Sequence, residues 1–208
     1  IYALDAVNKL SALDAGNGKR LWQIDISKPT EDESVISGGI SYAQGLLYAT
    51  SGFDEVLAID PAKGSILWRK KIKAPSRAAP TVLNGRVFVL TLNNRLIALN
   101  AQNGNLLWEH EGFTEGTNII GAASPAATND IVIAAFSSGE IAALRVENGS
   151  IAWTDNIAGI TRLGGMAGIT DIRALPVIDK GIVFAISFSG RMLAIDARTG
   201  NRIWQREI

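Results

Sequence analysis

Short runs of alternating apolar and polar residues, separated by turn residues, recur along the whole chain. Residues 56–59 and 66–68 are apolar runs that flank a polar segment with a glycine, a pattern typical of two antiparallel strands joined by a tight turn. Another pair of strand-like runs precedes this kind of hairpin, as at 79–83 and 87–90. No segment of useful length has helical periodicity. The pattern therefore predicts an all-β chain built from four-stranded units.

Each unit ends in one signature, in which an alanine, a glycine and a tryptophan keep a fixed spacing. The glycines of its five copies are Gly18, Gly64, Gly104, Gly149 and Gly200, and the tryptophans are Trp22, Trp68, Trp108, Trp153 and Trp204. The steps between tryptophans run from 40 residues (68 to 108) to 51 residues (153 to 204). These steps are in or near the range of about 40 to 50 residues per blade of a β-propeller.

The chemistry of a hairpin explains the signature without any ligand. Glycine supplies the positive φ of the turn, and an Asp or Asn at the first turn position can bind its own following backbone. The small alanine leaves room for the indole on the next strand, which would pack on the adjacent blade while its N–H finds an acceptor. Because the same residues recur in every copy, we interpret them as architectural.

Counting these units divides the chain, residues 1–208, into five blades of one partial propeller. Complete blades are predicted at 37–72, 78–110, 121–157 and 173–207, and the residues within 1–26 supply three strands that lack a first strand. Open blade faces would expose apolar surface, so propellers close into rings. We therefore expect the chain to be a fragment of a larger ring.

The connections between blades are the predicted place of function. The turns inside each blade are short, whereas the inter-blade loops at about 27–37, 111–120 and 158–172 are long. Long loops on a rigid scaffold are where binding concentrates. The last of these loops mixes apolar and charged residues, as is expected of a protein contact.

Composition removes several other kinds of function. Among 208 residues, Lys and Arg together number 20, as do Asp and Glu, so no bulk positive charge attracts nucleic acid. Cysteine is absent and His110 is the only histidine, so we expect no catalytic residue, no metal site and no cofactor. No apolar stretch approaches the roughly 18 residues of a transmembrane helix. The chain opens on Ile1 rather than Met, and we expect the natural N-terminus to lie upstream.

The five signatures resemble the tryptophan-docking repeat of the pyrroloquinoline-quinone-type propellers. That superfamily includes quinoprotein dehydrogenases and the non-enzymatic BamB family of outer-membrane assembly lipoproteins. The chain is most similar to the BamB family in its alphaproteobacterial form, with the closer match at residues 160–178 and 189–196. The resemblance implies an eight-bladed ring on the periplasmic side of the outer membrane, held there by an N-terminal lipid, of which about five blades are present.

The resemblance also implies a partner, the periplasmic POTRA domains of BamA in the BAM complex. Family members bind BamA through a Leu-x-Leu-Arg run and an Asp-x-Asp pair, which correspond here to residues 117–120 and 171–173. Apolar and acidic character is kept at Ile119 and Asp171, but Ile120 replaces a cation and Arg173 an anion, so the charge pairing is altered. The expected partner-binding residues are Ile119, Ile120, Arg162, Leu163, Asp171 and Arg173.

Two alternatives accompany this scaffold hypothesis. Exposed blade edges would bind unfolded outer-membrane protein precursors by strand pairing, which is also a non-enzymatic role. The rival from another class is a fragment of a quinoprotein dehydrogenase that uses pyrroloquinoline quinone and Ca²⁺. Alcohol-oxidising members of that class carry adjacent cysteines near the cofactor, and this chain has no cysteine. Binding of cofactor and Ca²⁺ together with dye-linked oxidation would distinguish the enzyme from the scaffold.

Overall fold

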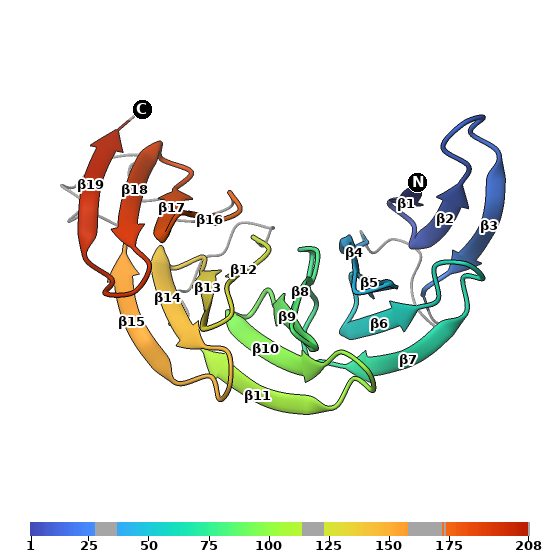
Figure 1. The fold of residues 1–208 in the computed structure, drawn as a ribbon, viewed down its shortest axis with the longest axis horizontal. Coiled ribbons are helices and arrows are strands. Elements are labelled where there is room, and N and C mark those ends of the chain that lie inside the picture. Colours follow the sequence, from blue (N-terminus) through green and yellow to red (C-terminus); the bar gives the residue numbers. More distant parts are fainter. Residues whose placement is uncertain (28–36, 114–122, 158–171, 173, 208) are drawn as a thin grey trace.

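The computed structural model describes residues 1–27, 37–113, 123–157, 172 and 174–207. These residues form 19 strands in five antiparallel sheets, and no helix occurs among them. The described part of the chain accordingly offers no helix that is long and apolar enough to cross a membrane. The sheets stand side by side as blades along an arc (Figure 1). The all-β propeller predicted from the sequence is confirmed.

Every sheet is a meander in which each strand pairs with its neighbour in the sequence. Blade one has three strands, β1 (Tyr2–Leu4), β2 (Lys9–Leu13) and β3 (Arg20–Asp25). Blade two consists of β4 (Ile40–Ala43), β5 (Leu46–Thr50), β6 (Glu55–Ile59) and β7 (Ile66–Lys71). Blade three consists of β8 (Thr81–Leu83), β9 (Arg86–Leu90), β10 (Arg95–Asn100) and β11 (Leu106–Glu111). Blade four consists of β12 (Ala126–Ala127), β13 (Ile131–Ala135), β14 (Glu140–Arg145) and β15 (Ile151–Asn156). Blade five consists of β16 (Val177–Asp179), β17 (Ile182–Ile186), β18 (Arg191–Asp196) and β19 (Arg202–Glu207).

The hydrophobic core is divided among the contacts between neighbouring blades. On β9, Val87 and Val89 pack toward blade two, while Phe88 and Leu90 pack toward blade four. The middle strands are therefore buried on both faces, which is why they read as continuous apolar runs rather than as strict alternation. The first strand of each complete blade lies on the concave side of the arc and the last strand on the convex side (Figure 1).

The signature tryptophans join each blade to the next one. The indole N–H donates to a backbone carbonyl in the following blade, from Trp22 to Pro61 (3.0 Å), Trp68 to Ala101 (2.9 Å), Trp108 to Val146 (2.9 Å) and Trp153 to Ala197 (2.8 Å). The indole also covers the signature glycine of that blade. A Cβ added at Gly149 would lie 2.6 Å from Cε3 of Trp108, at a residue whose φ is +73°. Glycine is thus required both for its backbone conformation and for the close approach of the ring.

Because each blade is an antiparallel meander, its connections fall on two opposite faces. The turns between first and second strands and between third and fourth strands lie on the short-turn face. The turns between second and third strands lie on the opposite face, which we call the long-loop face, and β3, β7, β11 and β15 end on it. The long-loop face is the one on which the sequence places partner binding.

Candidate functional site

The partner-binding residues expected from the sequence are Ile119, Ile120, Arg162, Leu163, Asp171 and Arg173, and all of them lie outside the described residues. The structure does describe where the loops that carry them leave and rejoin the blades. Residues 113 and 123 bound one loop, and residues 157 and 172 bound the other. We call these positions, with the equivalent ones after β3 and β7, the loop roots.

A backbone hydrogen bond holds the start of each link, just after the outer strand, to its own blade. The N–H of the residue after the outer strand donates to a carbonyl in the turn between second and third strands. These bonds run from Ile26 to Asn8 (2.9 Å), Ile72 to Asp54 (2.7 Å), Gly112 to Asn94 (2.8 Å) and Ile157 to Gly139 (2.9 Å). Three of the four acceptors are Asn or Gly with positive φ, a conformation that these residue types adopt most readily. The turn chemistry therefore sets the direction in which each loop leaves.

A charged side chain of the following blade then ties three of these roots to their neighbour. Arg69 of blade two donates to the Ile26 carbonyl (3.0 Å), and Arg191 of blade five donates to the Ile157 carbonyl (2.9 Å). Glu140 of blade four accepts the backbone N–H of Phe113 (3.1 Å). Hydrogen bonds to ionised groups are about twice as strong as neutral ones. Ile26, Phe113 and Ile157 are therefore fixed in position relative to two blades at once.

The tie between blades one and two contains a buried charge. Glu55, at the start of β6, is 2% exposed and forms an ion pair with Arg69, which is 24% exposed. A buried carboxylate is costly unless it is paired and hydrogen-bonded. Arg69 meets this need and also reaches the root at Ile26. One guanidinium thus joins the end of β3 to blade two.

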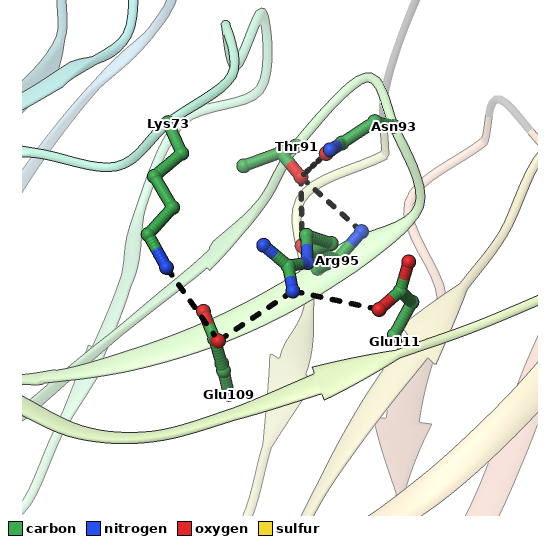
Figure 2. Close-up of polar contacts among 6 residues, drawn as sticks. All are labelled: Lys73, Thr91, Asn93, Arg95, Glu109 and Glu111. Atoms are coloured by element: carbon green, nitrogen blue, oxygen red, sulfur yellow. Dashed lines mark hydrogen bonds and ion pairs between the residues drawn. The ribbon is translucent and has the colours of Figure 1, made fainter.

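The link between blades two and three begins beside an ion-pair network on the surface of blade three (Figure 2). Nη2 of Arg95 lies 3.5 Å from Oε1 of Glu109 and 3.4 Å from Oε2 of Glu111. Nζ of Lys73, which follows β7, lies 3.9 Å from Oε1 of Glu109. The Thr91 hydroxyl accepts the Arg95 backbone N–H at 3.2 Å and orients the start of β10. Exposed pairs of this kind contribute about 0.2–1 kcal/mol each. The network therefore orients this root more than it stabilises the fold.

Phe113, at the root of the loop that carries Ile119, is the residue that sequence reasoning missed. Its N–H is held by Glu140, and its carbonyl accepts 2.8 Å from the Asn94 side chain. Its ring is nevertheless 75% exposed. An aromatic side chain that is exposed on a fixed backbone is well suited to bury surface against a partner. The only signal in the sequence is that this aromatic residue follows a glycine just beyond the end of a predicted strand.

His110, the single histidine, packs against an aromatic ring of the next blade. Its ring centroid lies 6.3 Å from that of Phe136 in blade four. The ring of Phe136 also explains the glycine at position 112, where an added Cβ would lie 2.9 Å from that ring. Within the described ranges, no group of three or more His, Cys, Asp or Glu residues is placed to hold a metal ion.

The first loop root carries a perturbed carboxyl group. The Ser27 hydroxyl donates to Asp25, and the Ser27 backbone N–H adds a bond of 2.9 Å. The pKa of the Asp25 carboxyl is lowered from its ordinary value, chiefly because the Ser27 hydroxyl donates to the charged form. Partial desolvation opposes this shift, and the Ser27 backbone bond and the charges of Lys9 and Arg69 add to it. The group is therefore ionised at neutral pH and keeps the end of β3 in a closed turn.

Known proteins resemble this chain over its whole length. The family model for outer membrane protein assembly factor BamB matches residues 6–208. BamB of Yersinia pestis is 29% identical over 100% of this chain and 54% of its own length, and BamB of Nitrosomonas eutropha is 30% identical over 100% of this chain and 49% of its own. The chain thus spans about half the length of these relatives.

Solved structures share the fold. The crystal structure of BamB from Moraxella catarrhalis superimposes with a TM-score of 0.86 at 23% identity, over 100% of this chain and 61% of that one. A europium-containing methanol dehydrogenase superimposes with a TM-score of 0.71 at 19% identity, over 100% of this chain and 49% of that one. The architecture alone is therefore common to assembly factors and dehydrogenases. The family model, which covers nearly every residue, distinguishes them: the chain belongs to the BamB family of outer membrane protein assembly factors.

Proposed function

We propose that the chain is part of a non-enzymatic scaffold subunit of the outer-membrane β-barrel assembly machinery, attached to the periplasmic side of the outer membrane. Its partner is the set of periplasmic POTRA domains of BamA, which bind the long-loop face. Membership of the family supports the role. The observation that carries the choice of face is the repeated tie between loop roots and following blades, through Arg69, Glu140 and Arg191. Such ties hold the starts of several loops in one frame before a partner arrives, which lowers the entropy lost on binding.

The proposed contact centres on the loop that begins at Phe113 and the loop between residues 157 and 172. Ile119, Ile120 and Leu163 would supply apolar contact. Arg162, Asp171 and Arg173 would supply orientation through charge. Phe113 adds an aromatic anchor to this set because its backbone is held at both ends while its ring is exposed. Aromatic residues in such settings are frequent hot spots of interfaces.

Binding to purified POTRA domains of BamA, measured by biolayer interferometry, tests this proposal. Phe113→Ala and the double variant Asp171→Lys with Leu163→Ala should each weaken binding about ten-fold or more, the usual effect of removing an interface hot spot. Leu107→Ala is the matched control, because Leu107 is also an exposed apolar residue of blade three (44% exposed) but lies on the outer strand. Its binding should equal that of the unaltered protein.

Two results would contradict the proposal. If all the altered proteins bound BamA as the unaltered protein does, the long-loop face would not be the interface. If added pyrroloquinoline quinone and Ca²⁺ gave bound quinone absorbance and dye-linked oxidation, the protein would instead act as the fold-sharing dehydrogenases do. Thermal unfolding of each variant separates lost contact from lost fold. The melting temperatures of Phe113→Ala and Leu107→Ala should match that of the unaltered protein, because both side chains are exposed.

A further inference from the structure

A groove opens between blades four and five on the short-turn face, opposite the proposed partner surface. Its volume is about 370 Å³, at the lower end of the roughly 300–1,000 Å³ of small-ligand sites. Its apolar wall comes from Ile131, Ala152, Ile178 and Ala197, and two guanidinium groups come from Arg145 and Arg198. The equivalent place between blades three and four holds only about 10 Å³. The groove is thus much larger than its counterpart at the neighbouring interface.

One departure from the repeat lies in the core beside this groove. In the other four blades an aromatic residue lies opposite the signature alanine and packs beside the tryptophan of its own blade, with centroids 5.9–6.1 Å apart: Tyr2, Tyr48, Phe88 and Phe184. Blade four has Ile133 in this register, opposite Ala143. Ile133 packs in the core between blades four and five, together with Ile195 and Ala197. Ile133 is fully buried and shares one core cluster with Ile131, Ile178 and Ala197, which line the groove. A side chain smaller than a ring contributes less volume to this interface.

A second departure puts positive charge at the same place. The other four hairpins start with Asp14, Asp60, Asn100 or Asp196, whose side-chain oxygens accept backbone N–H groups of the turn. Blade four has Arg145 instead, and a guanidinium has no acceptor. The turn therefore lacks the cap that every other copy has. Local rules of this kind are most often broken where another role requires the residue.

The two guanidinium groups are available to a ligand. Within the described ranges, the side chains of Arg145 and Arg198 form no hydrogen bond and no ion pair, and Arg198 has only a weak electrostatic contact with Asp196. Asp130 also lines the groove, so its lining carries one more positive than negative charge. This balance suits a single carboxylate and disfavours a dense polyanion. Two arginines can hold a carboxylate through charge-assisted hydrogen bonds.

We propose that this groove binds a peptide segment in which a carboxylate adjoins a large apolar side chain. The carboxylate pairs with Arg145 and Arg198, and the apolar side chain lies against Ile131 and Ile178. The volume accommodates groups of this size but not a dinucleotide or a lipid with long acyl chains. The site lies on the face away from the long loops and is independent of the proposed contact with BamA.

Fluorescence anisotropy with labelled hexapeptide amides tests this proposal on the purified protein. A peptide that ends in Phe-Asp-amide should bind at least ten-fold more tightly than the same peptide ending in Phe-Asn-amide or Gly-Asp-amide. Hydrocinnamate, a free acid with the same ring, should compete at least ten-fold more weakly than the unlabelled Phe-Asp peptide. Equal binding of the Asp and Asn peptides would overturn the charge assignment, and equal competition by the free acid would overturn the assignment to a peptide.

The variant Arg145→Asp separates loss of the site from loss of the fold. It reverses the charge and restores the acceptor that the other hairpins have, so the melting temperature should be unchanged or should rise by about 2–4 °C. Its affinity for the Phe-Asp peptide should nevertheless fall at least ten-fold. Lys63→Ala, on the same face of blade two, is the control and should bind as the unaltered protein does. Unchanged affinity of Arg145→Asp would refute the proposal.

Discussion

Replacement of Gly104 by alanine should destabilise the protein more than the same replacement of Gly85, although the two backbones are nearly alike. Both residues belong to blade three, with φ of +71° and +72°. A Cβ in this left-handed conformation costs about 1–2 kcal/mol at either position. The surroundings differ, because a Cβ at Gly104 would lie 2.7 Å from Cε3 of Trp68, whereas nothing lies within 4 Å at Gly85.

The difference in unfolding free energy between the two variants measures how much the packing of Trp68 on blade three contributes to stability. To relieve the clash, the indole of Trp68 must move away from blade three, which strains its 2.9 Å bond to the Ala101 carbonyl. Overpacking of a core costs about 1–3 kcal/mol, and a strained hydrogen bond adds up to about 1 kcal/mol. Gly104→Ala should therefore lower the free energy of unfolding by about 2–3 kcal/mol more than Gly85→Ala does.

Equilibrium unfolding in urea, followed by tryptophan fluorescence and by circular dichroism, gives this difference. Coincidence of the two transitions in each variant would show that a single unfolding free energy is meaningful. The m-values should stay equal, so that the midpoints report stability alone. Equal losses for the two variants would refute the reasoning, because the cost would then come from the backbone conformation and not from the approach of the indole to Gly104.

Three further outcomes follow from the same contacts. Trp108→Phe should cost about 2–3 kcal/mol in urea unfolding, because it leaves the carbonyl of blade four without its indole donor; a loss below about 0.5 kcal/mol would contradict this. Glu55→Ala should cost about 2 kcal/mol because Arg69 loses its carboxylate partner, and Glu55→Gln should cost less because its amide oxygen can still accept from the guanidinium; the reverse order would be inconsistent with this hydrogen bond. Ser27→Ala should raise the pKa of Asp25 in an NMR titration, because the hydroxyl favours the charged form. Since the pKa of Asp25 is lowered in the folded protein, the destabilisation should be full above about pH 4 and should fade as pH falls below it; a loss independent of pH would argue against the bond.

The fold was predictable because the information for a blade is local. A glycine with positive φ, an Asx residue at the turn and an alanine opposite a tryptophan lie within about a dozen residues of one another, so one hairpin reveals them all. The sequence predicted that the indole N–H of Trp153 would have an acceptor but did not predict which atom accepts it. It is the Ala197 carbonyl, 44 positions later, and only the stacking of blades brings the two together.

The candidate site was less predictable for the same reason. Phe113 shows no pattern of its own, since its fixed backbone depends on Glu140, 27 positions away in the next blade. The sequence shows that Arg145 departs from the repeat. That it can serve a binding site is apparent only from the structure, where Arg145 lines the groove. The loop residues Ile119 and Asp171 remain predictions from resemblance.

The strand count of each blade, the tight turns and the identity of the docking tryptophans could be read from the sequence alone. The strands and turns follow from hydrogen bonding between residues that are near one another in the chain, and the tryptophans are recognised because they recur in five copies. The folded structure was needed to show which side chains hold the loop roots, Arg69 and Arg191 among them, and where two blades leave a groove. Those properties depend on contacts between blades about 40 residues apart, and no local pattern records the volume and charge that meet there.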